Sequence, residues 1–188
     1  MLNVLGIDPG MINLGWGSVS LENEVLSLGL SGLISHPRDT AIPFNEYLNA
    51  GINQIADRFP IVLSLVRSTI IAAESVPSGR LGSRSELVVA AITSCKVIAF
   101  QWGIPWYDIA ANTVKKRMTD NGKATKVQVR NAVIERFPEI GANHEAIKKD
   151  QKEAGEKATG IVQDVFDAIA VSLSGLEIYG DEYANKDK

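Results

Sequence analysis

The amino-acid sequence predicts an α/β fold in which helices flank a five-stranded mixed sheet. Three observations lead to this prediction: three short extended runs at the N-terminus, two further strand-like runs later in the chain, and helical apolar spacing between and after them. This order of elements is typical of the α/β and α+β classes. With 188 residues, 45% of them hydrophobic, the chain can build a core, which excludes disordered and collagen-like classes.

The first three strands are expected at residues 3–8, 14–21 and 25–34. The first is a short apolar run that Pro9-Gly10 interrupts, and the second alternates large residues with small or polar ones. Because the connections between these strands are short, an antiparallel meander is the simplest way to pair them.

Helices alternate with two further strands in the middle of the chain. Residues 44–59 have apolar side chains at helical spacing, and Pro60 is expected to end that helix. The remaining strands are expected at residues 69–73 and 104–109. The helix between them, at 86–102, is apolar on more than one face, so something besides the sheet is expected to cover it.

The C-terminal part is expected to hold two or three more helices. Thr125 and Gln128 have the spacing of a capping box, which predicts a helix from there to Phe137. The polar residues 141–160, rich in Lys and Glu, suit either a loop or an exposed helix. A last helix with an apolar stripe is expected to end near Glu177.

Composition also limits the domain organisation and the setting. No repeat or linker divides the chain, so a single domain is expected over residues 1–178, followed by a disordered tail at 179–188. The longest apolar runs fall far short of the roughly 20 residues that a membrane-spanning helix needs, so no membrane association is expected. The single cysteine, Cys95, cannot form an internal disulfide, which fits a reducing, cytoplasmic setting.

Basic residues are concentrated in one segment, although the net charge of the chain is −3. Residues 115–136 contain seven lysines and arginines but only two acidic residues. Such a concentration is typical of a surface that meets the phosphates of a nucleic acid. The alternative is a solvated helix face that carries spare charge.

Four carboxylates occupy positions that need an explanation. Asp8 and Glu74 each end an apolar strand, while Asp164 and Asp167 lie three residues apart on a helix, next to its apolar stripe. A turn, a strand end or a solvated helix face would explain each acid singly. Together they predict an oxygen-only site for Mg²⁺ or Mn²⁺, since the chain has no cluster of His and Cys and no phosphate-binding glycine loop. A divalent cation beside a basic segment points to phosphate chemistry.

Several short motifs occur in an order that one nuclease family shares. They are Gly6-Ile7-Asp8-Pro9-Gly10 with Gly15-Trp16-Gly17, Ala73-Glu74-Ser75-Val76, Ala110-Ala111 with Val114-Lys115, Lys126-Val127-Gln128-Val129, and D-V-F-D-A-I-A from Asp164. Over about residues 3–176 the chain resembles the RuvC family of Holliday junction resolvases, in the RNase H-like superfamily. The resemblance implies an RNase H-like sheet with three antiparallel N-terminal strands followed by two parallel strands.

The resemblance also implies an activity, that of a crossover junction endodeoxyribonuclease. Such an enzyme resolves four-way or other branched DNA by paired symmetric nicks, leaving 5′-phosphate and 3′-hydroxyl ends, in a bacterial cell or a phage-infected host. The residues that match the family's site are Asp8, Glu74, Asp164 and Asp167, implied to hold two Mg²⁺ ions for which Mn²⁺ can substitute, and Lys115, implied to stabilise charge on the phosphate.

Contacts to DNA are expected from basic residues on two segments. The expected residues are Arg80, Arg84, Lys115, Lys116, Lys123 and Lys126. Where the family usually places an aromatic residue three positions after the glutamate, to stack at the opened junction, this chain has Pro77. The two arginines that follow are therefore expected to hold the junction through phosphates or by stacking a guanidinium plane on a base.

Paired nicks imply a homodimer, because one site cannot cut two strands together. The helix at residues 86–102 is the expected interface, and the alternative is that it is buried within the monomer. Other functions remain open at this point. They are an RNase H-like nuclease acting on flaps, forks or RNA–DNA hybrids, and a non-catalytic protein that binds branched DNA. An actin-like ATPase is disfavoured, since 188 residues do not hold two such lobes.

Overall fold

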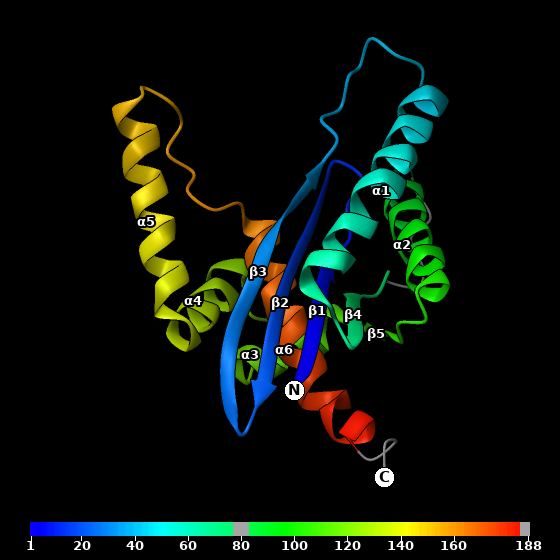
Figure 1. Ribbon diagram of the computed structural model, residues 1–188. Helices are drawn as coiled ribbons and strands as arrows, with labels where there is room; N and C mark the ends of the chain where they lie inside the picture. The colour runs from blue at the N-terminus through cyan, green and yellow to red at the C-terminus, as the bar shows by residue number, and fades with distance from the viewer. Residues whose placement is uncertain (77–82, 185–188) are drawn as a thin grey trace.

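A five-stranded mixed sheet forms the centre of the computed structural model, which describes residues 1–76 and 83–184 (Figure 1). The strands are β1 (Leu2–Asp8), β2 (Asn13–Glu22), β3 (Val25–Ser35), β4 (Ile70–Glu74) and β5 (Trp106–Ile109). The helices are α1 (Phe44–Val66), α2 (Ser83–Gln101), α3 (Ala111–Thr119), α4 (Lys126–Arg136), α5 (Pro138–Glu153) and α6 (Gln163–Ala184). No helix within the described residues is long and apolar enough to cross a membrane.

The sheet has the predicted mixture of antiparallel and parallel pairs. Its strand order is β3-β2-β1-β4-β5, with β1, β2 and β3 antiparallel and with β4 parallel to both β1 and β5. Asp8 and Glu74 are the last residues of two neighbouring parallel strands. Since parallel strands end at the same edge of a sheet, the two carboxylates emerge side by side.

Two hydrophobic cores cover the two faces of the sheet. Alternation along β1 places Val4 in the core that α3, α4 and α6 share, and Leu5 and Ile7 in the core under α1 and α2. Helix α6 lies very close to β1, because a Cβ atom at Gly6 would stand 2.0 Å from the carbonyl oxygen of Ala168. The glycine of the N-terminal motif therefore permits the approach of the helix that carries two of the acids.

Helix α1 continues past Pro60, so the predicted end at that residue is wrong. The helix runs to Val66, and Arg67 closes it in the left-handed conformation with φ 51°. A proline inside a helix removes a backbone hydrogen bond and costs about 3 kcal/mol. Val62 and Leu63, which follow the proline, are buried against the sheet, and their burial offsets that cost.

The C-terminal half differs from the prediction in two places and decides between two alternatives in a third. Helix α3 occupies Ala111–Thr119, where only a connecting segment is expected from the sequence. Of the two alternatives given for the polar segment at 141–160, the structure shows the exposed helix, which is α5, Pro138–Glu153. Helix α6 continues to Ala184, six residues into the segment expected as a disordered tail.

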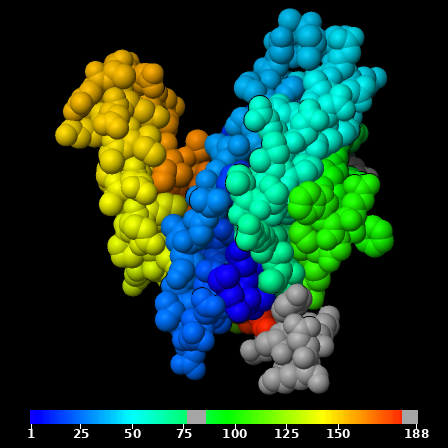
Figure 2. Space-filling view, viewed as in Figure 1, coloured from blue at the N-terminus to red at the C-terminus, as the bar shows by residue number. Residues whose placement is uncertain are grey.

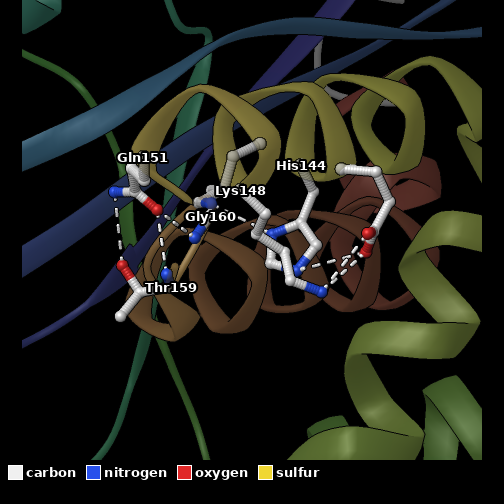
Figure 3. A network of polar contacts seen from close by, with 7 residues as sticks. His144, Lys148, Gln151, Thr159 and Gly160 are labelled. Carbon is white, nitrogen blue, oxygen red and sulfur yellow. Dashed lines mark hydrogen bonds and ion pairs between the residues drawn. The ribbon is translucent and has the colours of Figure 1, made fainter. Parts of the chain in front are cut away.

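Helix α5 stands apart from the sheet at one side of the molecule (Figure 1). In the space-filling view a hollow separates it from β3 and α1, and residues of β3, α5 and α6 line a groove there (Figure 2). A polar network ties its C-terminal half to the segment that leads into α6 (Figure 3). The Ile161 backbone N–H donates to His144 Nδ1 at 3.0 Å, and Gln151 Oε1 accepts from the backbone N–H groups of Thr159 and Gly160, each at 2.8 Å.

Candidate active site

The predicted acidic residues converge where β1 and β4 end and α6 begins. Asp8, Asp164 and Asp167 each offer an oxygen atom, and these atoms lie within 4.8 Å of one another. Glu74 lines a cavity of about 120 Å³ together with Asp8 and Asp167. Carboxylates from two strands and one helix therefore converge at one place, where Asp8, Glu74 and Asp167 line the cavity and Asp164 lies close to both other aspartates.

Close backbone packing brings the acids of α6 to the end of β1. A Cβ atom at Gly15, which pairs with Asp8 across the β1–β2 ladder, would stand 2.1 Å from the carbonyl oxygen of Asp164. Further along the helix, Ser172 Oγ donates to the Val4 carbonyl at 2.6 Å and accepts from the Val19 N–H at 3.1 Å. The first turns of α6 are thus fixed against β1 and β2.

The electrostatics of this cluster favour binding of a cation. Burial, followed by the charges of Asp167 and Glu74, raises the pKa of Asp8 from 3.8 to about 8. Burial and the charge of Asp167 also raise the pKa of Glu74. Carboxylates held together in a poorly solvated place need a compensating positive charge. Since all the donors are carboxylate oxygens, the residues fit a hard divalent cation.

Two lysines face the same cavity from α3 and α4. Lys126 begins α4, whose predicted capping box is present, and its Nζ donates to Asp167 Oδ2 at 2.7 Å. Burial alone would lower the pKa of Lys126, but the hydrogen bond and charge of Asp167 raise it above its ordinary value. Lys115 lines the cavity from α3. Both lysines therefore stand where a phosphate bound to the carboxylates would lie.

Gln163 is a member of the site that sequence reasoning missed. Its Nε2 donates to Asp167 Oδ1 at 2.9 Å and lies 3.4 Å from the carbonyl oxygen of Lys126. It thereby holds one oxygen of Asp167 and joins the first turns of α4 and α6. The signal in the sequence is its position four residues before Asp167, at which two side chains on a helix are neighbours.

Lys116 and Lys123, two other predicted DNA contacts, do not line the carboxylate cavity. Lys116 lines a separate cavity of about 660 Å³ on α3 and α6, together with Arg117. Lys123 is exposed in the connection between α3 and α4, where its backbone N–H donates to Asn121 Oδ1 at 3.0 Å. Arg80 lies outside the described residues. Arg84 belongs to the first turn of α2, and its side chain lies outside the described part of the structure.

Comparison with known families identifies the chain. A sequence model of the family described as "Crossover junction endodeoxyribonuclease RuvC" matches residues 4–150. The chain belongs to the RuvC family. The matched region includes Asp8, Glu74, Lys115 and Lys126, while Asp164 and Asp167 lie beyond it and join the site through the geometry described above.

Individual RuvC proteins are similar over much of the chain. The crossover junction endodeoxyribonuclease RuvC of Maricaulis maris is 28% identical over 176 residues, which cover 92% of this chain and 89% of the relative. That of Beijerinckia indica subsp. indica is 30% identical over 131 residues, covering 68% of this chain and 70% of the relative.

Solved structures confirm the fold. The Thermus thermophilus RuvC structure aligns with a TM-score of 0.69 and 23% identity, over 97% of each chain. The same values hold for T. thermophilus RuvC in complex with a Holliday junction substrate. A yeast mitochondrial Holliday junction resolvase aligns with a TM-score of 0.61 and 14% identity, over 97% of this chain and 81% of the other. The RNase H-like fold expected from the sequence motifs is therefore confirmed.

Proposed function

We propose that this RuvC-family chain is a metal-dependent endonuclease that resolves four-way DNA junctions by paired symmetric nicks. The observation that carries the proposal is the convergence of Asp8, Asp164 and Asp167 within 4.8 Å, beside Glu74 and two lysines. Family membership supplies the DNA substrate class. An oxygen-only cation site flanked by ammonium groups is the arrangement that hydrolysis of a phosphodiester requires.

The acids are proposed to hold two Mg²⁺ ions, with Mn²⁺ as a substitute. When bound, the cations supply positive charge to the phosphate and a water of lowered pKa. Asp8 ends β1 close to the two acids of α6. Because its pKa is raised, it releases a proton when it becomes a ligand. The four carboxylates serve as ligands and none attacks phosphorus.

The two lysines are proposed to act on the phosphate itself. Lys115 donates from its ammonium group to a non-bridging oxygen, where negative charge builds up as water adds to phosphorus. The bond from phosphorus to the 3′ oxygen breaks, and that oxygen takes a proton, so the products carry a 5′-phosphate and a 3′-hydroxyl. Lys126, held by Asp167 at 2.7 Å, orients that carboxylate and adds positive charge at the rim of the cavity.

Helix α2 is proposed as the interface of a homodimer. Val89 is 41% exposed and Phe100 is 86% exposed, and Val97 and Trp102 add further exposed apolar surface along the same helix and just beyond it. Ile92, at 6% exposure, packs into the core of its own monomer and does not belong to this surface. A contiguous exposed apolar surface of this kind marks an association site. Two copies related by a two-fold axis would present two sites to one junction.

A panel of substrates tests the proposed function. Synthetic four-way, forked, flap, linear and RNA–DNA hybrid substrates are incubated with the protein and Mg²⁺, Mn²⁺ or EDTA. We expect symmetric nicks in opposite strands of the four-way junction with either metal and no cleavage in EDTA. Asp167→Asn should abolish cleavage while retaining junction binding, and Asp57→Asn, on the exposed face of α1, should cleave normally.

The alternatives give different results in the same panel. Faster cleavage of flaps, forks or hybrids than of junctions would identify another RNase H-like specificity. Junction binding without cleavage under every metal condition would identify a non-catalytic binding protein. Near-native cleavage by Asp167→Asn would overturn the assignment of the metal ligands.

A further inference from the structure

A second cavity is lined in part by Asp164, one of the three clustered aspartates. It has a volume of about 540 Å³, within the range of sites that accept small organic groups. Its lining residues are Gly10, Met11, Ile12, Asn13, Arg38, Leu87, Val88 and Asp164. Asp164 thus belongs both to the lining of this cavity and to the cluster of three aspartates whose oxygen atoms lie within 4.8 Å of one another.

The lining of this cavity combines an apolar surface with one cation. Met11 is 3% exposed and forms part of the floor, and Ile12 is 43% exposed at the start of β2. Leu87 and Val88 contribute apolar surface from α2, and Arg38 comes from the segment between β3 and α1. An apolar surface beside a guanidinium group suits a flat, uncharged ring that is joined to a phosphate.

The backbone that carries Ile12 is held firmly by its surroundings. The His36 N–H donates to the Ile12 carbonyl at 2.8 Å. The His36 ring contacts Gln54 Oε1 at 3.1 Å, while the Tyr47 hydroxyl donates to the His36 carbonyl at 3.0 Å. Met11 fits against Gly51, where a Cβ atom would stand 2.3 Å from its sulfur. The cavity is therefore formed before any ligand binds, with the Ile12 side chain left partly exposed at its edge.

The chemistry of the occupant follows from the neighbouring site. A phosphate bound at Asp8 and Asp167 is covalently joined to nucleosides on both sides, and the proximity of Asp164 to both aspartates brings this cavity within reach of one of them. Aliphatic side chains such as Ile and Met can stand against or between bases that leave the stack. Arginine pairs with phosphate through two parallel hydrogen bonds.

We propose that this cavity receives a nucleobase next to the cleaved phosphate, with its face against Ile12 and Val88 and its flanking phosphate on Arg38. The proposal rests on the proposed function, since it takes branched DNA as the substrate. Because the cavity has a defined size, it accepts some bases better than others, and cleavage then depends on which base occupies that position. Ile12 and Arg38 are accordingly assigned as residues that determine the sequence preference of cleavage.

Fluorescence of a base analogue tests this assignment directly. Junctions carry 2-aminopurine at each position within two nucleotides of the mapped cut, and they are bound in Ca²⁺, which takes oxygen ligands in a looser geometry than Mg²⁺. We expect the fluorescence at one position to rise several-fold with the native protein, because that base leaves the stack. In Ile12→Ser this rise should fall by at least half. In Val25→Ser, an exposed residue at the far end of the β2–β3 hairpin, it should be unchanged.

Binding and cleavage measurements extend the same test. Arg38→Gln should weaken junction binding about threefold and lower its salt dependence by about one phosphate. Arg58→Gln, exposed on α1 away from this cavity, serves as its matched control. In Mg²⁺, Ile12→Ser should reduce the differences in cleavage rate among junctions that vary only at the identified base, by about fivefold or more. Thermal unfolding and circular dichroism establish that each variant is folded.

The outcomes separate this inference from the proposed function. If the native protein cuts junctions but Ile12→Ser matches Val25→Ser in fluorescence and in sequence preference, the assignment of the cavity is wrong and the proposed function stands. If the protein binds junctions without cutting them under any metal condition, no phosphate is cleaved, and both the proposed function and the assignment of the cavity are overturned. If no branched DNA binds, both proposals are overturned.

Discussion

Asp8 is a buried carboxylate surrounded by other carboxylates, and its pKa is strongly raised. Its carboxyl group lies at the end of a buried strand, and burial together with the charges of Asp167 and Glu74 raises its pKa to about 8. The folded protein therefore binds this proton more tightly than the unfolded chain does, in which the pKa is ordinary. As the pH rises from about 4 to about 8, the unfolded chain loses the proton first, and the stability of the metal-free protein falls.

Asp8→Asn should raise the thermal unfolding midpoint in EDTA, because the neutral amide removes this titration. The gain over the native protein should grow from about pH 5 to about pH 8. Added Mg²⁺ should stabilise the native protein and have little effect on the variant. Circular dichroism melts with and without Mg²⁺ measure both effects, and Asp57→Asn is the exposed control on α1. A native midpoint in EDTA that does not change over this pH range would contradict the expectation.

Gln163 contacts the proposed metal ligand Asp167, so we expect it to act as a positioning residue. Its amide holds Asp167 Oδ1 and leaves Oδ2 toward the lysine. Gln163→Ala should raise the Mg²⁺ concentration for half-maximal cleavage about tenfold, as is usual for groups that orient a metal ligand. The rate at saturating Mg²⁺ should change much less.

A metal titration of cleavage separates these two effects. Asn53→Ala, an exposed amide on α1, should behave as the native protein does. If Gln163→Ala lowers the saturated rate and leaves the Mg²⁺ dependence unchanged, its role is not to orient Asp167.

The secondary-structure elements show which parts of the site the sequence could predict. Asp8 and Glu74 could be predicted because each directly ends an apolar run, and parallel strands deliver their ends to one edge. The helix that begins at Lys126 could be predicted from its capping box. Helix α3 could not, since its first turn has no side-chain cap and only Val114 and Met118 are buried along it. The contact of Gln163 with the first residue of α4 could not either, because only the tertiary fold brings that residue near.

Helix α5 is held at its C-terminal half by a histidine that must be neutral. Burial, then the charges of Lys148 and Arg130, lowers the pKa of His144 below its ordinary value. His144 Nδ1 accepts a hydrogen bond from the Ile161 N–H, and a protonated ring has no free lone pair there (Figure 3). The unfolded segment binds the proton more readily, so this contact loses stability as the pH falls below about 6.5.

Acidification should therefore loosen the segment between α5 and α6. Protection of backbone amides at residues 154–162 against hydrogen exchange should fall about tenfold between about pH 7.5 and about pH 5.5, after correction for the intrinsic rate. In His144→Gln, whose amide oxygen accepts a hydrogen bond without titrating in this range, the pH dependence should disappear. Equal protection of the native segment at both pH values would show that His144 does not control this contact.

The whole molecule places the candidate active site and the proposed dimer surface on different sides of one sheet. Helices α3, α4 and α6 cover the face that supplies both lysines and two acids, while α1 and α2 cover the other. The exposed apolar residues of α2 thus lie away from the lysines of α3 and α4. A dimer formed through α2 leaves both active sites open, which allows one junction to be cut on two strands.

Val89→Arg should separate the two nicks without impairing the chemistry of either site. A charged residue at a packed two-fold interface disfavours association, so sedimentation at micromolar concentration should change from dimer to monomer. On a supercoiled plasmid that extrudes a cruciform, the native protein should produce mainly linear DNA, because both strands are cut within one encounter. The variant should produce mainly nicked circles.

Val25→Arg, exposed at the hairpin end, should remain dimeric and give linear product. Ile92→Arg should instead lower the unfolding midpoint, since that side chain is buried in the monomer. A native protein that sediments as a monomer yet still gives linear product would show that paired cutting does not depend on this helix.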